Sequence, residues 1–168
     1  ALDISVVGIY NSETDSYRCY ETHELNDLWP VIERADVLIG FNSEHFDIPL
    51  LNKYYQGDLK KIKSIDLMKE VKRSLGRRVS LSALAKATLN EGKSGNGLEA
   101  IIWWKKGEKE KVKKYCTDDV RITKNLYDYA LINKKLKLFE QSNVIDIPID
   151  TSGWEVHTKK VMTYSLPF

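Results

Sequence analysis

The chain has 168 residues, of which 42% are hydrophobic and 30% charged, a composition typical of a folded domain that excludes disordered, collagen-like and low-complexity classes. A formal net charge of +2, from 26 basic and 24 acidic residues, is too small to identify a partner. No apolar run approaches the roughly 20 residues of a membrane span, and the two cysteines show no metal-site spacing. We expect one soluble, intracellular and cytoplasmic domain in a reducing compartment, without a membrane partner.

The first third of the chain predicts a hairpin, a helix and a buried strand. The β-branched and aromatic run 4–10 and the extended segment 17–20 flank a polar turn, as in a hairpin. Apolar residues recur at helical spacing over 24–34, although Pro30 interrupts the pattern. Residues 37–41 form an almost fully apolar run, which is typical of a strand buried on both faces. This order of elements predicts a mixed α/β sheet.

Helices dominate the rest of the sequence. We expect them over 46–55, 67–75, 80–89, 98–105 and from 108 to about 131. Gly76 is placed to close the second of these helices and Ser80 to cap the third. Only weak strand patterns follow, at 137–140 and 144–149. We therefore expect one domain over residues 1–140 and a C-terminal tail over 141–168.

Basic residues are concentrated in two stretches. Eight lysines and arginines fall in 60–78, where the only acids are Asp66 and Glu70, and a second group lies in 105–114. A phosphate backbone could use both stretches. The alternative is that they are solvated helix faces that carry ion pairs between residues one turn apart.

The first candidate site is the segment 40–49 (GFNSEHFDIP), where the buried strand ends and a helix begins. Ligand sites in open α/β sheets favour this position. Asp47 is the candidate functional carboxylate, but Asp before a helix with Pro49 in its first turn is also typical of an N-cap. His45 has no second His or Cys at metal-site spacing, so it is not a candidate ligand.

The second candidate site is the segment 115–119 (YCTDD) inside the long predicted helix. Tyr115 and Asp119 project from one face, one turn apart, while Asp118 points elsewhere. A phenol and a carboxylate can therefore share a site. The alternative is a boundary tyrosine that packs beside a solvent-facing aspartate.

Trp103 and Trp104 precede Lys105 and Lys106, an arrangement that can stack nucleobases beside positive charge. The alternative at helical spacing is one tryptophan in the core and one half-exposed.

Together these segments resemble a known family. GFNSEHFDIPLL is similar to the second motif, and YCTDD to the third (Tyr-x-x-x-Asp) motif, of the DEDDy branch of 3'-5' exonucleases, which have the ribonuclease H-like fold. The chain also resembles prokaryotic predicted exonucleases related to family-B polymerase proofreading domains. The segments that carry this resemblance are LIGFNSEHFDIPLL, SIDLMKEV, LSALAKATL, GKSGNG and KKYCTDDVRIT. The resemblance covers roughly residues 1–140.

This resemblance implies a metal-dependent 3'-5' exonuclease that hydrolyses phosphodiester bonds at single-stranded DNA or RNA ends. It implies that Asp47 and Asp119 bind two divalent ions, Mg²⁺ or Mn²⁺, and that Tyr115 positions the attacking water. It places Asn42 beside the nucleic-acid end, and we add Lys93 and Trp104 as candidate nucleic-acid contacts. Asp66 is interpreted first as an N-cap.

The sequence departs from the family at the first motif, an Asp-x-Glu on the first core strand of the ribonuclease H-like mixed sheet. Residues 3–5 (Asp-Ile-Ser) have Ser where the motif requires Glu, and residues 144–148 have Pro at that position. A site without two of its four carboxylates predicts poor catalysis, and a missing core strand predicts an exposed sheet edge. Three explanations are open: truncation, a strand supplied from elsewhere, or a non-catalytic nucleic-acid-binding module. We favour truncation because the residues of the second and third motifs all remain.

Overall fold

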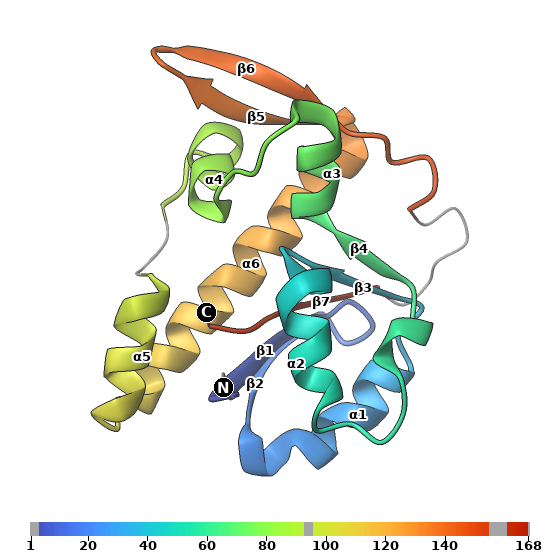
Figure 1. The fold of residues 1–168 in the computed structure, drawn as a ribbon, viewed down its shortest axis with the longest axis vertical. Coiled ribbons are helices and arrows are strands. Elements are labelled where there is room, and N and C mark those ends of the chain that lie inside the picture. Colours follow the sequence, from blue (N-terminus) through green and yellow to red (C-terminus); the bar gives the residue numbers. More distant parts are fainter. Residues whose placement is uncertain (1–3, 93–95, 155–160, 168) are drawn as a thin grey trace.

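The computed structural model describes residues 4–92, 96–154 and 161–167, and its centre is a five-stranded mixed sheet (Figure 1). The strand order is β2-β1-β7-β3-β4. In that order the strands are Ser16–Glu21, Val6–Asn11, Val161–Ser165, Val37–Gly40 and Ser64–Asp66. The predicted α/β architecture, a mixed sheet flanked by helices, is confirmed.

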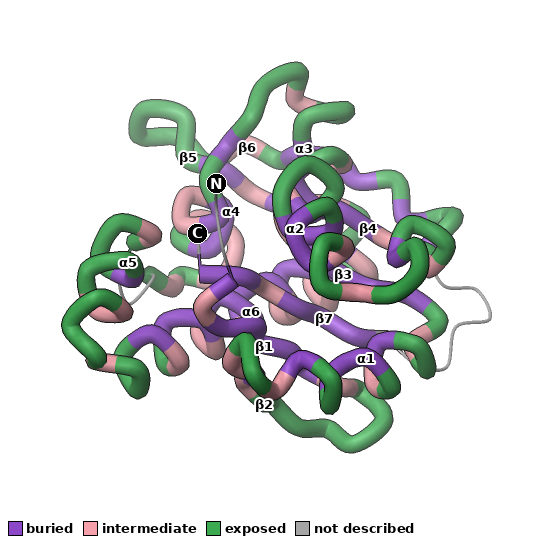
Figure 2. The backbone as a smooth tube through the Cα atoms, turned by 60° about the horizontal axis from the view of Figure 1, so that its bottom comes forward, coloured by how far each residue is buried: buried purple, intermediate pink, exposed green. Residues whose placement is uncertain are grey.

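Helices cover both faces of the sheet (Figures 1 and 2). One face packs on α1 (Leu25–Glu33) and α2 (Ile48–Asn52), and the other on the long helix α6 (Lys109–Asn133). Strand β3 shows why both faces are apolar, because Leu38 enters the first core while Val37 and Ile39 enter the second. No helix in the described ranges is long and apolar enough to cross a membrane.

The central strand, β7, comes from the far end of the chain. It runs antiparallel to β1, with Gly8 opposite Ser165, and parallel to β3, with Ile39 opposite Thr163. The sequence predicts an exposed sheet edge where the first core strand is missing. That expectation is wrong, because β7 lies between β1 and β3 and pairs with both. A strand from beyond residue 140 therefore lies at the centre of the sheet.

Two further strands form a separate hairpin, β5 (Lys135–Glu140) with β6 (Asn143–Pro148). The apolar face of this hairpin packs in the same core as α6, and β5 also packs on α4 (Leu81–Leu89). The two weak strand patterns in the tail are thus confirmed with slightly different bounds. Residues 144–148 pair only with β5 among the described strands, so they do not replace a strand of the main sheet.

The helix ends follow the local signals in the sequence. α3 (Leu67–Leu75) is capped by Asp66 at its N-terminus and by Gly76 at its C-terminus, where the φ of 87° is left-handed. Ser80 caps α4, and Asn96 caps α5 (Gly97–Lys105). The predicted helix over 46–55 is shorter, because its first residues form a π-helical turn, η2 (Ser43–Asp47), before α2. Short 3₁₀ turns η1 (Thr22–Glu24) and η3 (Leu59–Lys61) complete the chain.

Gly40, the last residue of β3, is required by close packing. A Cβ at this position would lie 2.6 Å from the Cβ of Ser43 and 3.0 Å from the ring of Tyr164. We expect Gly40→Ala to lower the free energy of unfolding by about 2 kcal/mol, because buried atoms must move to admit it. Gly92→Ala is the matched control, since a Cβ there meets open space, and it should change stability by less than about 0.5 kcal/mol. Urea denaturation followed by fluorescence measures both, and equal values would contradict the packing argument.

Candidate active site

One cavity of about 260 Å³ opens where the parallel strands β3 and β7 end. Its walls come from the β3–α2 connection, the starts of α3 (Leu67–Leu75), α4 and α5 (Gly97–Lys105), one face of α6 and the end of β7. The lining residues are Phe41, Asn42, Asp47, Met68, Leu81, Gly97, Tyr115, Asp119, Thr123, Ser165 and Leu166. The structure therefore brings together five residues of the two predicted site segments, 40–49 and 115–119, which are more than 60 positions apart in the chain.

Asp47 is the last residue of the π-helical turn and is only 5% exposed. The alternative interpretation of Asp47 as a helix cap is wrong, because its backbone is already helical and its side chain makes no capping hydrogen bond. Burial raises the pKa of the Asp47 carboxyl well above its usual range, and the negative charges of Asp66 and Asp119 raise it further. Burial and two neighbouring carboxyl groups therefore disfavour the ionised form of Asp47 when no cation is bound.

Asp66 holds the loop that carries Asn42. Its carboxylate accepts the backbone N–H of Asn42 at 2.7 Å, of Glu44 at 3.3 Å and of Met68 at 3.0 Å. The Met68 bond confirms the predicted N-cap, whereas the other two connect β4 to the segment after β3. This support matters because Asn42 has a left-handed φ of 59°, a backbone conformation that few side chains favour.

Tyr115 and Asp119 project from α6 into the cavity, as their spacing predicts, and are 3% and 5% exposed. The ring of Tyr115 meets the ring of Trp103 edge-on, with centroids 6.4 Å apart. Asp118 does not line the cavity and pairs with Lys114 at 3.2 Å. The predicted difference between the two neighbouring aspartates is confirmed.

The other predicted nucleic-acid contacts, Trp104 and Lys93, are not among the described residues that line the cavity. Trp103 and Trp104 are both half-buried, so neither is a core residue, and the ammonium of Lys109 lies 5.4 Å from the ring centre of Trp104. Neither tryptophan is among the residues that line the cavity. Lys93 lies outside the described residues.

Three of the eight basic residues in the stretch 60–78, namely Lys69, Arg73 and Arg77, form surface ion pairs with described residues. Lys69 pairs with Glu44 at 3.1 Å, and Arg73 pairs with Glu70 at 3.2 Å one turn earlier. Arg78 differs, because its guanidinium donates to the side-chain oxygen of Asn42 at 2.8 Å. One basic residue of this stretch therefore reaches the rim of the cavity.

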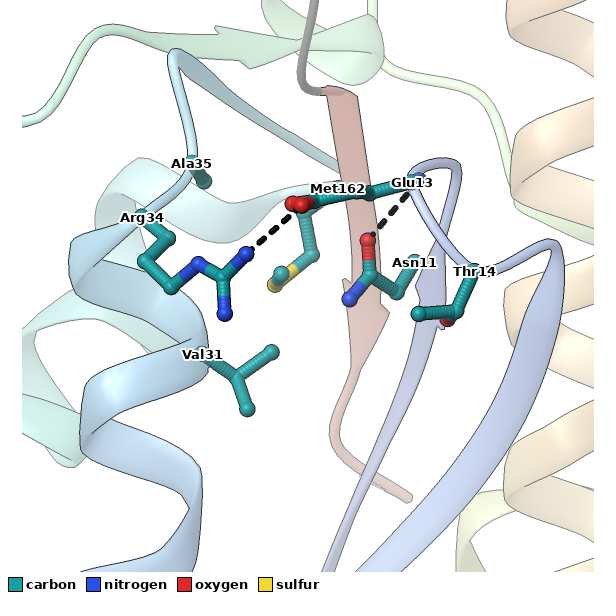
Figure 3. Close-up of a pocket in the computed structure, with 7 residues that line it drawn as sticks. All are labelled: Asn11, Glu13, Thr14, Val31, Arg34, Ala35 and Met162. Atoms are coloured by element: carbon teal, nitrogen blue, oxygen red, sulfur yellow. Dashed lines mark hydrogen bonds and ion pairs between the residues drawn. The ribbon is translucent and has the colours of Figure 1, made fainter.

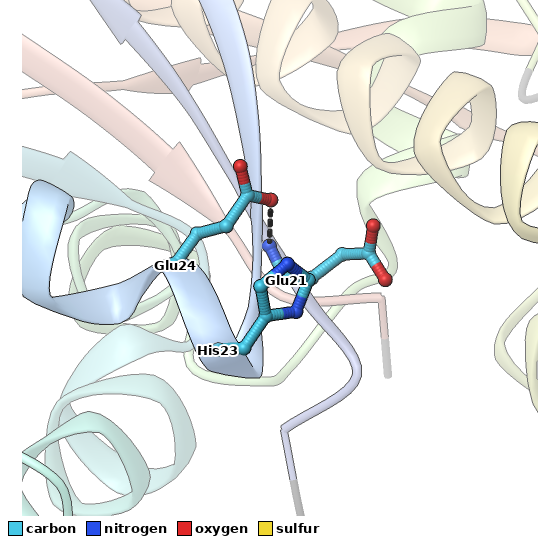
Figure 4. A group of neighbouring side chains, drawn as sticks. All are labelled: Glu21, His23 and Glu24. Carbon is cyan, nitrogen blue, oxygen red and sulfur yellow. Dashed lines mark hydrogen bonds between the residues drawn. The ribbon is translucent and has the colours of Figure 1, made fainter.

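A compact group of potential metal ligands lies elsewhere, at Glu21, His23 and Glu24 (Figure 4). Glu21 already accepts from Lys109 at 3.0 Å and Lys113 at 3.2 Å, and Glu24 closes a capping box on its backbone N–H. These bonds explain the group without an ion.

A smaller cavity, of about 50 Å³, lies near the opposite end of β7 between the β1–β2 turn and α1 (Figure 3). Two of its lining residues, Arg34 and Glu13, form an ion pair at 2.6 Å. None of its lining residues belongs to either predicted site segment.

Six residues that line the larger cavity lie outside the two predicted site segments: Met68, Leu81, Gly97, Thr123, Ser165 and Leu166. The last two, Ser165 and Leu166, come from the far end of the chain. Nothing local marks them, because their place depends on β7 entering the sheet between two strands from the other end of the chain.

The fold and the cavity define an α/β domain in which two buried carboxylates and a tyrosine meet where parallel strands end. The chain belongs to the RNase H superfamily, whose family model matches residues 2–131. Comparisons with curated proteins and with solved structures give no match. Membership of this superfamily indicates nuclease-type chemistry on nucleic acids. The matched range ends before β5, so β7 lies outside it.

Proposed function

We propose that this domain is a metal-dependent 3'-5' exonuclease that acts on single-stranded DNA or RNA ends. The observation that carries the proposal is the convergence of Asp47, Tyr115 and Asp119 on one cavity from separate parts of the chain. In this proposal Asp47 and Asp119 hold Mg²⁺ or Mn²⁺, and Tyr115 orients the attacking water. Asn42 contacts the terminal nucleotide at the rim.

The donor chemistry of the cavity fits a hard divalent cation, because carboxylate oxygens are the ligands that Mg²⁺ and Mn²⁺ prefer. A bound cation lowers the pKa of water and offsets charge at the phosphate. Burial and like charge disfavour the ionised form of Asp47, and a cation would relieve both effects. Among the described lining residues, only Asp47 and Asp119 are carboxylates, so this set fits one ion better than two.

The test is cleavage of a 5'-labelled single-stranded oligonucleotide by the full chain with Mn²⁺. We expect slow shortening from the 3' end that stops with EDTA and falls at least tenfold in Asp119→Asn. Asp118→Asn is the matched control, because it removes the neighbouring carboxylate, which pairs with Lys114 outside the cavity, and it should cut at the parental rate. Cleavage that survives both EDTA and Asp119→Asn would reject the proposal.

A second candidate function is nucleic-acid binding without cleavage. The observation that favours it is the end of β7, which presents Ser165 and Leu166 to the cavity instead of further carboxylates. This candidate predicts oligonucleotide binding that weakens with salt, together with no Mn²⁺-dependent shortening. Fluorescence anisotropy at two salt concentrations, alongside the cleavage assay, separates the two functions.

A further inference from the structure

The two cysteines of the chain, 97 positions apart, meet between β2 and α6. Cys19 lies on β2 directly opposite Gly8 of β1. A Cβ at Gly8 would lie 2.9 Å from the sulfur of Cys116 on α6. The absence of a side chain at Gly8 thus leaves the space in which the Cys116 sulfur lies beside the β1–β2 pair. This meeting of thiols is independent of the proposed nuclease function.

Each thiol has defined neighbours. The sulfur of Cys19 lies 3.3 Å from the hydroxyl of Thr117 and 3.6 Å from the carbonyl oxygen of Lys113. The sulfur of Cys116 lies 3.3 Å from the carbonyl oxygen of Ser165. Thr117 directly follows Cys116 in α6, so the Cys19 sulfur lies against the turn of the helix that carries Cys116. Both sulfurs are therefore held close together by contacts from α6 and β7.

The two thiols differ in reactivity. The neighbouring Cys116 thiol lowers the pKa of the Cys19 thiol to about 7, and the Thr117 hydroxyl and the Lys113 charge also lower it, against the effect of burial. The neighbouring Cys19 thiol and complete burial raise the pKa of the Cys116 thiol well above its usual range. Cys19 is also partly exposed, whereas Cys116 is buried. Cys19 is thus the nucleophile that an oxidant in solution meets first, and Cys116 is the neighbour that can respond.

We propose that Cys19 and Cys116 are a peroxide-reactive pair that forms a reversible disulfide between β2 and α6. The Cys19 thiolate attacks one peroxide oxygen, the O–O bond breaks, and the released hydroxide takes up a proton to leave as water. The sulfenic acid on Cys19 is then attacked by Cys116, which gives up its proton as the S–O bond breaks and a second water leaves. In sum, two thiols are oxidised to one disulfide, and one hydrogen peroxide is reduced to two waters. The cross-link ties β2 to the helix that carries Tyr115 and Asp119.

Intact-mass measurement of the full chain tests this proposal, because the sequence holds two cysteines. Treating the reduced protein with a small excess of hydrogen peroxide should remove about 2 Da from the monomer, and dithiothreitol should restore it. Digestion without reductant should then yield one peptide pair linked through Cys19 and Cys116. A gain of about 16 or 32 Da on cysteine without that loss, or disulfide-linked dimers, would overturn the proposal.

Two single variants separate the roles of the thiols. In Cys116→Ser the oxidation should stop at the Cys19 sulfenic acid, which dimedone traps. In Cys19→Ser the remaining buried thiol should react with peroxide at least tenfold more slowly than the parent chain. Both methionines, Met68 and Met162, are buried, and any sulfoxide on them adds mass that dithiothreitol does not remove. Equal peroxide reactivity of the two variants would contradict the assignment of Cys19 as the attacking thiol.

Discussion

Replacing Asp66 with alanine is expected to lower the free energy of unfolding by about 3–4 kcal/mol. Its carboxylate accepts three backbone N–H groups, at 2.7, 3.0 and 3.3 Å, and the residue is 4% exposed. Two of these bonds cross from β4 to the loop after β3, so no local helix cap replaces them. Alanine would leave polar groups around a buried position without their acceptor, which costs roughly 1–3 kcal/mol for each group.

Two variants serve as controls for Asp66→Ala. Asp58→Ala removes an aspartate that accepts one local N–H, that of Lys60, at an exposed position, and should cost no more than about 1 kcal/mol. Asp66→Asn keeps one acceptor oxygen but places an amide donor toward the remaining N–H groups, and should lie between the two alanine variants. Guanidinium denaturation followed by tryptophan fluorescence measures all three. If Asp66→Ala were no less stable than Asp58→Ala, the bonds from β4 to the β3 loop would not contribute to stability.

Much of the fold could be predicted because its signals are local. The apolar run of β3, the capping serine at Ser80 and the terminating Gly76 each depend on neighbours within one turn or strand. β4 was not predicted, because it has three residues inside a basic stretch, too few to show alternation. β7 was not predicted because its five residues form a strand only through pairing with β1 and β3, which are distant in sequence.

The same distinction applies to the candidate site. The spacing of Tyr115 and Asp119 on a helix places both on one side, and the structure agrees. Whether Asp47 caps a helix or faces a cavity depends on the π-helical turn before α2, which sequence periodicity does not indicate. The hydrogen bond from the loop after β3 to the Asp66 carboxylate depends on tertiary packing alone, and so does the proximity of Cys19 and Cys116. Contacts of this kind carry no local sequence signal.

Asp47→Asn is expected to stabilise the metal-free protein at neutral pH, by about 1–3 kcal/mol, because the parent must either hold a proton on Asp47 or bury its charge beside two other carboxylates, and the amide needs neither. The raised pKa of Asp47 means that the folded protein keeps this proton to a higher pH than the unfolded chain does. Above the ordinary carboxyl pKa of about 4, the folded state therefore holds more protons, and stability falls as pH rises toward the folded pKa. The advantage of the asparagine variant should shrink toward zero below about pH 4.

Thermal melts in EDTA at several pH values, with Asp118→Asn as the surface control, measure this difference. Repeating them with Mn²⁺ separates a binding role of Asp47 from a purely structural one. A ligand that binds only the folded state raises its stability, so Mn²⁺ should raise the melting temperature of the parent chain and of Asp118→Asn but not of Asp47→Asn. A carboxylate that binds the ion at a cost in stability predicts two results together. Its asparagine variant should be more stable than the parent chain without Mn²⁺, and Mn²⁺ should not change the melting temperature of that variant. If Asp47→Asn were instead less stable than the parent in EDTA at neutral pH, the carboxylate would be a structural group, and the cavity would lose one of its two proposed metal ligands.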